Sequence, residues 1–207
     1  MKNLIIIGAG GHVKVCLDIA LKMNQWQEIY FLDDNADHDT CLGHKIVGSS
    51  QDAFKYKDTS DFFVAIGDNK TREKVLTNLI QGEYSIATLI HPQSIINSFV
   101  SVGIGTVVMA GTVINSDTKI GIGCILNTNS TIEHDNLIHD YVHISPGVNL
   151  AGNVSIGERS WIGIGSTVIN NISVASDVQL GGSALVVKDI EDEGIYVGFP
   201  VRTRSNE

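Results

Sequence analysis

The sequence predicts two consecutive parts, an α/β unit followed by a parallel β-solenoid. Over the first 85 or so residues, short apolar runs alternate with stretches that have the spacing of amphipathic helices. From Val102 to Val186 every sixth residue is aliphatic, fifteen positions in phase. Glycine often follows the aliphatic residue in this second stretch. Alternating strands and helices are typical of a parallel sheet, whereas a short fixed period is typical of a solenoid.

The first part predicts a small Rossmann-like half domain. Each predicted strand is a short apolar run that stops at glycine or aspartate, as buried parallel strands do. The predicted helices carry apolar residues on one face. In chain order we expect strands and helices at Leu4–Ile7, Val13–Met23 (helix), Ile29–Leu32, Phe62–Ile66 and Lys70–Ile80 (helix).

The period of six predicts one short strand and one turn in each repeat. The aliphatic side chain then points inward and stacks on its equivalent in the next coil. Burying one such side chain contributes about 1.5–3 kcal/mol, which chain entropy opposes. Glycines are expected at corners that need positive φ. A β-sandwich would instead show period-two alternation. The aliphatic positions are Val102, Val108, Ile114, Ile120, Leu126, Ile132, Ile138, Ile144, Leu150, Ile156, Ile162, Val168, Val174, Leu180 and Val186.

Composition excludes several classes of protein. The 207 residues carry a formal charge of −9, which argues against nucleic acid as a general partner. Three cysteines without paired spacing favour a reduced, cytoplasmic protein over a disulfide framework. The N-terminal apolar run is too short for a signal peptide, and no run is long enough to span a membrane. We therefore expect no stable membrane insertion.

Several motifs give the whole chain a family resemblance. They are IIIGAGGH at 5–12, FLDD at 31–34, AIGDN at 65–69, LNTNSTIEHD at 126–135, HISPG at 143–147, LAGNVSIG at 150–157, LGGSALVVKDI at 180–190 and GFPVR at 198–202. With these motifs the chain resembles the hexapeptide-repeat sugar acetyltransferases of the bacillosamine, perosamine and sialic acid type. The resemblance implies a left-handed β-helix, here residues 86–207, after a nucleotide-sugar-binding α/β domain, here residues 1–85. It also implies acetyl-CoA as co-substrate.

His134 and Asp135 are the predicted catalytic residues. On position alone, His134 reads equally well as an exposed turn histidine, because it lies two residues beyond the aliphatic Ile132. An amine acceptor must lose a proton as it attacks a thioester, and imidazole suits that task near neutral pH. Asp135 can orient the ring. The resemblance places the family's catalytic histidine at His134, with an acidic neighbour.

Three further residues are predicted from the resemblance to bind the cofactor: His143, Ile164 and Gly182. Ile164 and Gly182 are 18 residues apart, so a coil of three hexapeptides stacks them on successive turns. A long pantetheine arm requires contacts of this kind along the solenoid. Packing at Ile164, a corner at Gly182 and a surface strand at His143 are the structural alternatives.

The predicted substrate-binding residues lie at strand ends in the first part. Gly10, Gly11 and His12 open a helix after a strand, and amides at a helix N-terminus favour a phosphate. The dinucleotide fingerprint fails, because Val13 stands where its third glycine is required. A nucleotide-linked sugar is therefore expected rather than NAD. Asp33 and Asp34 suit a ribose or a base edge, and Gly67 admits the same ligand.

The resulting functional hypothesis is acetyl-CoA-dependent N-acetylation of the 4-amino group of a UDP-linked 4-amino-6-deoxy sugar. O-acetylation of sialic acid or another sugar, and a non-catalytic nucleotide-sugar-binding scaffold, remain alternatives. A metal-dependent carbonic-anhydrase-type site is disfavoured, because His134 and His139 lack a third histidine at Ser98 or Ser116. No metal is expected.

A homotrimer is the expected assembly. Flat solenoid walls carrying outward apolar residues such as Val107, Val113, Ile125 and Trp161 favour closed symmetry. The resemblance implies a trimer with the acetyl-CoA cleft between neighbouring solenoids.

Overall fold

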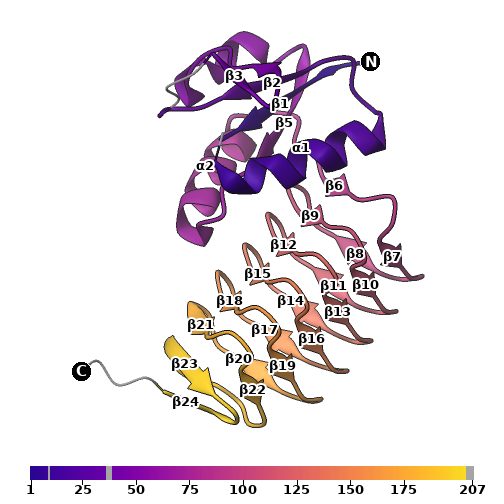
Figure 1. Cartoon of the computed structure of the whole chain (residues 1–207), viewed down its shortest axis with the longest axis vertical. Helices are drawn as coiled ribbons and strands as arrows, with labels where there is room; N and C mark the ends of the chain where they lie inside the picture. The colour runs from indigo at the N-terminus through magenta and orange to yellow at the C-terminus, as the bar shows by residue number, and fades with distance from the viewer. Residues whose placement is uncertain (9, 36–38, 204–207) are drawn as a thin grey trace. The chain divides into compact units, whose positions relative to one another are not determined.

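The computed structural model describes residues 1–8, 10–35 and 39–203. The chain divides into two compact units, residues 1–92 and 93–207. The predicted fold class is confirmed, since an α/β unit is followed by a parallel β-solenoid (Figure 1). No helix within the described residues is long and apolar enough to cross a membrane.

The α/β unit is built on a parallel three-stranded sheet in the order β2–β1–β5. Its strands β1 (Asn3–Ile7), β2 (Ile29–Leu32) and β5 (Ser60–Val64) are largely buried, as their continuous apolar runs predict. Asn24, in the left-handed conformation, ends the first helix, and the Asp68 side chain caps the second by accepting from the Thr71 amide. The remaining elements are α1 (Gly11–Met23), β3 (Thr40–Cys41), β4 (His44–Lys45), η1 (Ser50–Tyr56), α2 (Asn69–Gln81) and β6 (Leu89–Ile90).

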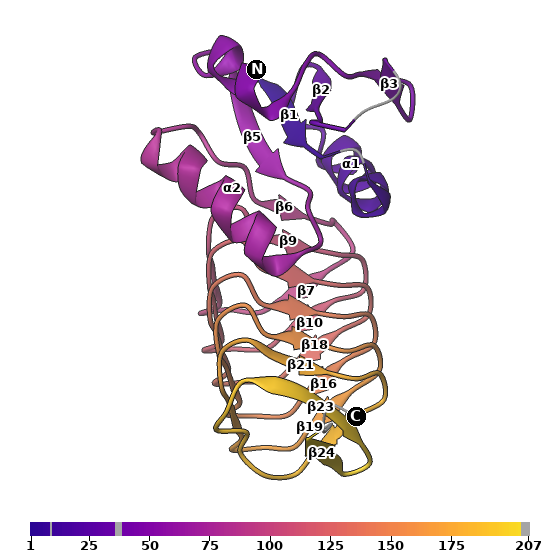
Figure 2. The same ribbon diagram turned by 90° about the vertical axis from the view of Figure 1, so that its left-hand side faces the viewer.

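The solenoid stacks two-residue strands into three parallel sheets, and paired residues on neighbouring coils are 18 apart (Figure 2). We name the three sheets after β12, β13 and β14, the three strands of one coil. The β12 sheet contains β9 (Val107–Val108), β12 (Ile125–Leu126), β15 (His143–Ile144), β18 (Trp161–Ile162), β21 (Val178–Leu180), β23 (Gly194–Gly198) and β24 (Val201–Thr203).

The other two sheets complete each coil. The β13 sheet contains β7 (Ile95–Ile96), β10 (Val113–Ile114), β13 (Thr131–Ile132), β16 (Asn149–Leu150), β19 (Thr167–Val168) and β22 (Leu185–Val186). The β14 sheet contains β8 (Ser101–Val102), β11 (Lys119–Ile120), β14 (Leu137–Ile138), β17 (Ser155–Ile156) and β20 (Ser173–Val174). β23 and β24 form an antiparallel hairpin after the last coil.

The predicted aliphatic ladder forms the solenoid core. Every ladder residue from Val108 to Val186 is buried, and only Val102 is half-buried. Hydroxyl side chains four residues further on pin the corners. Thr106 Oγ1 donates to the Gly121 carbonyl at 2.8 Å and accepts from the Cys124 amide at 3.0 Å, and Ser160 repeats the pattern. The buried backbone of one coil is thereby tied to the next.

The corner glycines fall into two groups, and only one group, which consists of Gly105, Gly111, Gly123, Gly147 and Gly165, has the predicted positive φ. The left-handed residue stands three positions after each ladder residue, at every sixth position from Phe99 to Ser183, and most of these residues are not glycine. Gly103, which directly follows a ladder residue, does not have a positive φ. A Cβ there would lie 2.4 Å from the Gly121 carbonyl oxygen. These glycines are therefore needed because neighbouring coils approach closely.

The exposed apolar wall also differs from the sequence prediction. Val107 and Ile125 are buried within the single chain, so a partner chain cannot cover them. Val113 is half-buried, and Trp161 is 45% exposed. Ile164, at 61%, is more exposed than any of these four residues.

Candidate functional site

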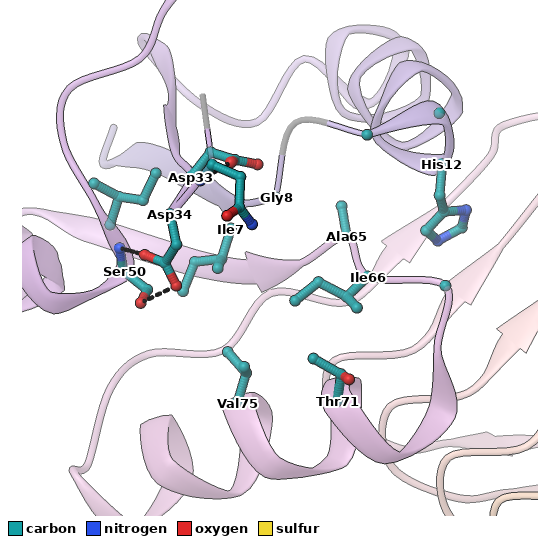
Figure 3. Close-up of a pocket in the computed structure, with 15 residues that line it drawn as sticks. Ile7, Gly8, His12, Asp33, Asp34, Ser50, Ala65, Ile66, Thr71 and Val75 are labelled. Carbon is teal, nitrogen blue, oxygen red and sulfur yellow. Dashed lines mark hydrogen bonds between the residues drawn. The ribbon is translucent and has the colours of Figure 1, made fainter. Parts of the chain in front are cut away.

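All six predicted substrate-binding residues line one pocket of the α/β unit. The pocket has a volume of about 510 Å³ and lies at the carboxyl ends of the sheet strands (Figure 3). Gly10, Gly11 and His12 border it from the start of α1, Asp33 and Asp34 from the end of β2, and Gly67 from beyond β5. Open sheets of this kind bind ligands at this edge.

The two aspartates at the end of β2 are held by local hydrogen bonds. Asp34 accepts from the Ser50 amide at 2.7 Å and from the Ser50 hydroxyl at 2.8 Å, as Figure 3 shows. Asp33 accepts from the Asn35 amide at 2.7 Å, closing a turn. A carboxylate oxygen has further lone pairs, so both groups can still accept from a ligand. Ser50, which the sequence analysis did not single out, fixes the orientation of Asp34.

His12 occupies the opposite end of the pocket, close enough to Arg72 to be influenced by its charge. Burial, and secondly the charge of Arg72, lower the pKa of His12 to about 4. The ring Nε2 lies 3.4 Å from the Cys16 sulfur, and burial raises the pKa of that thiol. His12 is therefore neutral at pH 7, and in this form its ring offers hydrogen-bonding nitrogens rather than a positive charge.

Arg72 is a buried residue that sequence analysis missed. It is 1% exposed, and its guanidinium donates to the carbonyls of Ile66 and Gly67, both at 3.0 Å. It also donates to Asn69 Oδ1 at 2.8 Å. Ile66 and Gly67 line the pocket, so Arg72 fixes the loop that forms this wall. An arginine inside an amphipathic helix gives no sequence signal for such a role.

His134 and Asp135 form a hydrogen-bonded pair at a corner of the solenoid. The ring Nδ1 lies 2.7 Å from Asp135 Oδ2, and the two side chains are 63% and 58% exposed. A carboxylate only accepts, so Nδ1 carries the hydrogen and Nε2 is left with a lone pair. Asp135 adopts φ +59°, a left-handed conformation that aspartate tolerates. Both residues lie in the turn between β13 and β14.

Two buried polar side chains clamp the backbone of this turn. Asn136, only 1% exposed, donates to the carbonyls of Glu133 at 2.6 Å and Ala151 at 3.1 Å. Its Oδ1 accepts from the Val154 amide at 2.6 Å. Thr118 Oγ1 donates to the Glu133 carbonyl at 2.8 Å. The turn is thus tied to the coils on both sides.

Gly152 provides the space for the imidazole. It lies one coil beyond His134 in the same register, and a Cβ at Gly152 would fall 2.6 Å from His134 Cε1. Any other residue would push the ring aside. The sequence alone can identify Gly152, because it stands 18 residues after His134 and one coil contains 18 residues.

His143 lies on a wall of the solenoid. Its ring stacks parallel to Trp161, with centroids 5.4 Å apart and an interplanar angle of 3°. Asn127 Nδ2 lies 3.3 Å from His143 Nε2, and Trp161 donates to Ser145 Oγ at 2.8 Å. The wall at His143 is therefore an ordered aromatic surface.

Ile164 and Gly182 lie together, but away from His134 within one chain. The Ile164 carbonyl accepts from the Ser183 amide at 2.8 Å, and a Cβ at Gly182 would lie 3.1 Å from Ile164 Cγ2. Both follow strands of the β12 sheet, whereas His134 follows the β13 sheet. The two corners therefore bound opposite edges of the β13 sheet. The predicted catalytic and cofactor residues do not form one cluster in a single chain.

Comparisons with known proteins show which family has this architecture. Residues 3–79 match the PglD N-terminal domain. UDP-N-acetylbacillosamine N-acetyltransferase of Bacillus subtilis (strain 168) is 35% identical over 111 residues, which span 51% of this chain and 50% of that relative. The acetyltransferase domain of PglB from Neisseria gonorrhoeae FA1090 superposes with a TM-score of 0.95 at 34% identity, covering 99% of this chain and 100% of that one. The chain belongs to the hexapeptide-repeat sugar acetyltransferase family.

A second solved member of this family was crystallised with its ligands. It is a histidine-to-alanine mutant of GDP-perosamine N-acetyltransferase from Caulobacter crescentus, in complex with CoA and GDP-perosamine. It is 31% identical, with a TM-score of 0.94, and the match covers 100% of this chain and 98% of that one. The PglB domain has also been solved in complex with acetyl coenzyme A.

Within residues 1–8, 10–35 and 39–203, no three His, Cys, Asp or Glu side chains are grouped so that they could hold a metal ion. Near His134, Asp135 orients the ring, Asn136 fixes the backbone of the turn, and Gly152 leaves room for the imidazole.

Proposed function

We propose that this protein transfers an acetyl group from acetyl-CoA to the 4-amino group of a nucleotide-linked 4-amino-6-deoxy sugar, with UDP as the carrier. Membership of the sugar acetyltransferase family supports the reaction class. Relatives with acetyl coenzyme A, or with CoA and GDP-perosamine, support the two substrates. The pocket that Asp33 and Asp34 line supports a binding site for the nucleotide part.

The His134–Asp135 pair is the observation that carries the proposal. With Nδ1 donating to Asp135, the free Nε2 lone pair can accept the proton that the sugar amine loses. Asp135 stabilises the imidazolium that forms, as the carboxylate does in other histidine-based sites. The clamp at Asn136 and Thr118 keeps the pair at a fixed place on the corner.

The proposed transfer is direct, within a complex of both substrates. The neutral amine attacks the thioester carbonyl carbon and forms the new C–N bond, while His134 takes the amine proton. The tetrahedral intermediate then expels the CoA thiolate, which takes up a proton to become the thiol. In this proposal a backbone amide near Gly152 stabilises the oxyanion. Cys124, which is buried, is not an acyl carrier in this scheme.

A thiol-release screen tests the acceptor. Purified protein is assayed with acetyl-CoA and UDP-, GDP- or dTDP-linked 4-amino sugars, with free sialic acid as the O-acceptor arm. We expect the highest kcat/KM with a UDP-linked amine. Preference for GDP would change the carrier only, and preference for sialic acid would support O-acetylation. Binding of the nucleotide sugar without CoA release from any acceptor would support the scaffold alternative and contradict an acyltransferase.

We further propose that the active unit is a homotrimer whose sites lie between subunits. His134 and the Ile164–Gly182 corner bound opposite edges of the β13 sheet, so a second copy is needed to bring such residues face to face. Trp161 and Ile164 are exposed apolar side chains that such a contact would cover. Closed threefold symmetry satisfies both requirements.

Two measurements test the trimer. Light scattering at micromolar concentration should give about three times the chain mass of 22.3 kDa. Mixing inactive His134→Ala chains with inactive Gly182→Trp chains should restore part of the activity, because mixed assemblies contain some intact sites. A fully active monomer would rule out the shared site.

A further inference from the structure

A phenylalanine near the start of the solenoid is both exposed and strained. Phe99 is 83% exposed, and its backbone has φ +65°, in the left-handed region. Exposure of a large apolar ring and a left-handed conformation at a bulky residue both cost free energy, and such costs are typical of functional positions. We propose that Phe99 contacts the 6-methyl group of the acceptor sugar and selects 6-deoxy sugars over their 6-hydroxy counterparts. This inference rests on the proposed use of a nucleotide-linked 4-amino-6-deoxy sugar.

The coil register places Phe99 in the same column of the corner as Asp135. Strand pairings β7–β10 and β10–β13, before the corner, each advance the chain by 18 residues. Pairings β8–β11 and β11–β14, after the corner, do the same. Phe99, Asp117 and Asp135 are therefore equivalent residues of three successive coils, and Phe99 lies two coils before the proposed catalytic pair.

Phe99 differs chemically from the left-handed residues that follow it in this column. Asp117, Asp135, Asn153 and Asn171 have φ values between +57° and +62°. Aspartate and asparagine tolerate this conformation because their short polar side chains can hydrogen-bond locally. A benzyl side chain gains nothing of this kind. The fold alone therefore favours aspartate or asparagine at position 99, and the phenyl ring needs another reason.

The surface that leads from this phenylalanine to the proposed general base suits a sugar. Ser98 and Ser116, the coil equivalents of the catalytic histidine, offer hydroxyl groups and are exposed and half-buried, respectively. Beside them, Asn97 Nδ2 donates to Asn115 Oδ1, and Asn115 Nδ2 donates to Glu133 Oε2 at 2.7 Å. Groups of this kind hydrogen-bond sugar hydroxyls, whereas an aromatic ring covers an apolar part of a ligand.

The separation suits one sugar ring. Neighbouring strands are ~4.8 Å apart, so Phe99 lies ~9.6 Å from Asp135 along the solenoid axis. A benzyl group extends ~6 Å from its Cα, which leaves about one van der Waals contact of ~4 Å. The His134 ring lies against Gly152, on the coil beyond it, so the imidazole does not fill the space on the side of Phe99.

The position of the methyl group on the sugar fits this geometry. In a 4-amino-6-deoxy hexose, the methyl group is borne by the carbon next to the amine-bearing carbon. An amine held at His134 therefore keeps the methyl group close to the same level of the corner. A phenyl ring extended along the corner from Phe99 meets that methyl group and excludes water from it.

Calorimetry of the full chain with defined nucleotide sugars tests the contact. The probes are the UDP-linked 4-amino-6-deoxy sugar, its 6-hydroxy counterpart and UDP alone, with the GDP and dTDP series in parallel. We expect wild type to bind the 6-deoxy sugar about tenfold more tightly than the 6-hydroxy sugar, since an apolar contact of this size discriminates by roughly 10–200-fold. Phe99→Asn should lose that preference and leave the affinity for UDP unchanged.

Two further variants serve as controls. Phe99→Tyr keeps the ring and should keep the preference for the 6-deoxy sugar. Phe54→Asn removes another phenylalanine, 67% exposed in η1, that does not line the nucleotide pocket. It should bind all the probes like wild type.

Thermal unfolding and light scattering separate this role from a structural one. Asparagine at position 99 matches Asn153 and Asn171, so Phe99→Asn should melt about 2–4 °C higher than wild type and keep its mass. A lower Tm or a smaller mass would make Phe99 a packing or subunit contact and overturn the sugar contact. An unchanged preference for the 6-deoxy sugar, or an equal loss of affinity for UDP, would also overturn it. A wild type that binds none of the nucleotide sugars would instead overturn the proposed function.

Discussion

The α/β unit and the solenoid position their functional side chains in different ways. In the solenoid, a side chain's place follows from its number in the repeat, because equivalent residues 18 apart stack on successive coils. In the α/β unit, the pocket joins segments with no fixed spacing, such as the start of α1, the loop after β5 and the turn at Ser50. A site in a periodic structure can therefore be read from the sequence by register, whereas the pocket depends on tertiary contacts.

The ladder is the feature on which the solenoid depends most, and breaking it should have the largest effect. Ile156 is fully buried in β17, and Ile156→Asp places an unpaired carboxylate in an aliphatic stack. We expect no soluble folded protein on expression. The adjacent Ser155→Asp, whose side chain points outward, should express and melt like wild type. A folded Ile156→Asp protein with the wild-type melting temperature would contradict the register.

Removing the imidazole of His134 tests whether this residue of the solenoid corner acts as the general base. His134→Ala should lower kcat at least a hundredfold, in line with about 10²–10⁴ for general base catalysis. The melting temperature should hardly change, because the ring is exposed and lies outside the ladder. His139→Ala, five residues further on in the next repeat, is the control and should keep most of its activity. More than half the activity in His134→Ala would remove this residue from the mechanism.

Buried polar clamps allow the two units to be compared directly. Asn136→Ala removes three hydrogen bonds inside the solenoid and leaves their partners unsatisfied, so we expect a loss of about 3 kcal/mol in unfolding free energy. Arg72→Met in the α/β unit should cost about 1 kcal/mol, because the lost bonds are offset by removal of a buried charge. Urea unfolding measures both values. Equal losses would show that the two clamps contribute alike.

The last comparison concerns pH. The pKa of His12 falls from an unfolded value of 6.5 to about 4 in the fold. Between pH 4 and pH 6.5 the imidazole of His12 therefore binds a proton in the unfolded state but not in the folded state. The stability from this group is complete above pH 6.5 and is lost as pH falls through 4.

His12→Gln tests this contribution because it removes the titrating group and keeps a polar side chain. Between pH 7 and pH 5 we expect wild type to lose about 1–2 kcal/mol more unfolding free energy than the variant. Thermal unfolding of both proteins at pH 7, 6 and 5 gives the comparison. Parallel losses in the two proteins would show that His12 is not desolvated as the structure indicates.

Much of the architecture was accessible from the sequence, for reasons specific to each part. The aliphatic period determined the solenoid strands, and the ends of apolar runs located the pocket residues from Gly10 to Gly67. The clamps were not accessible, because Asn136 and Arg72 act on carbonyls brought near them only by folding. The sequence located the glycines that follow ladder residues, but the reason predicted for them, a positive φ, was wrong. These glycines are required because neighbouring coils approach closely.

The 18-residue register has a consequence for how insertions and deletions would affect this chain. Loss of six residues within the solenoid would keep every downstream ladder residue inside, yet it would rotate all later side chains by one face. Where the loss falls between His134 and Gly152, such a chain would retain its core and lose the alignment of these two residues. Loss of eighteen residues would preserve the faces and shorten the distance along the axis by one coil, ~4.8 Å. Deletions of six residues in this half of the protein thus preserve the fold, whereas only deletions of eighteen residues also keep each later side chain on its own corner.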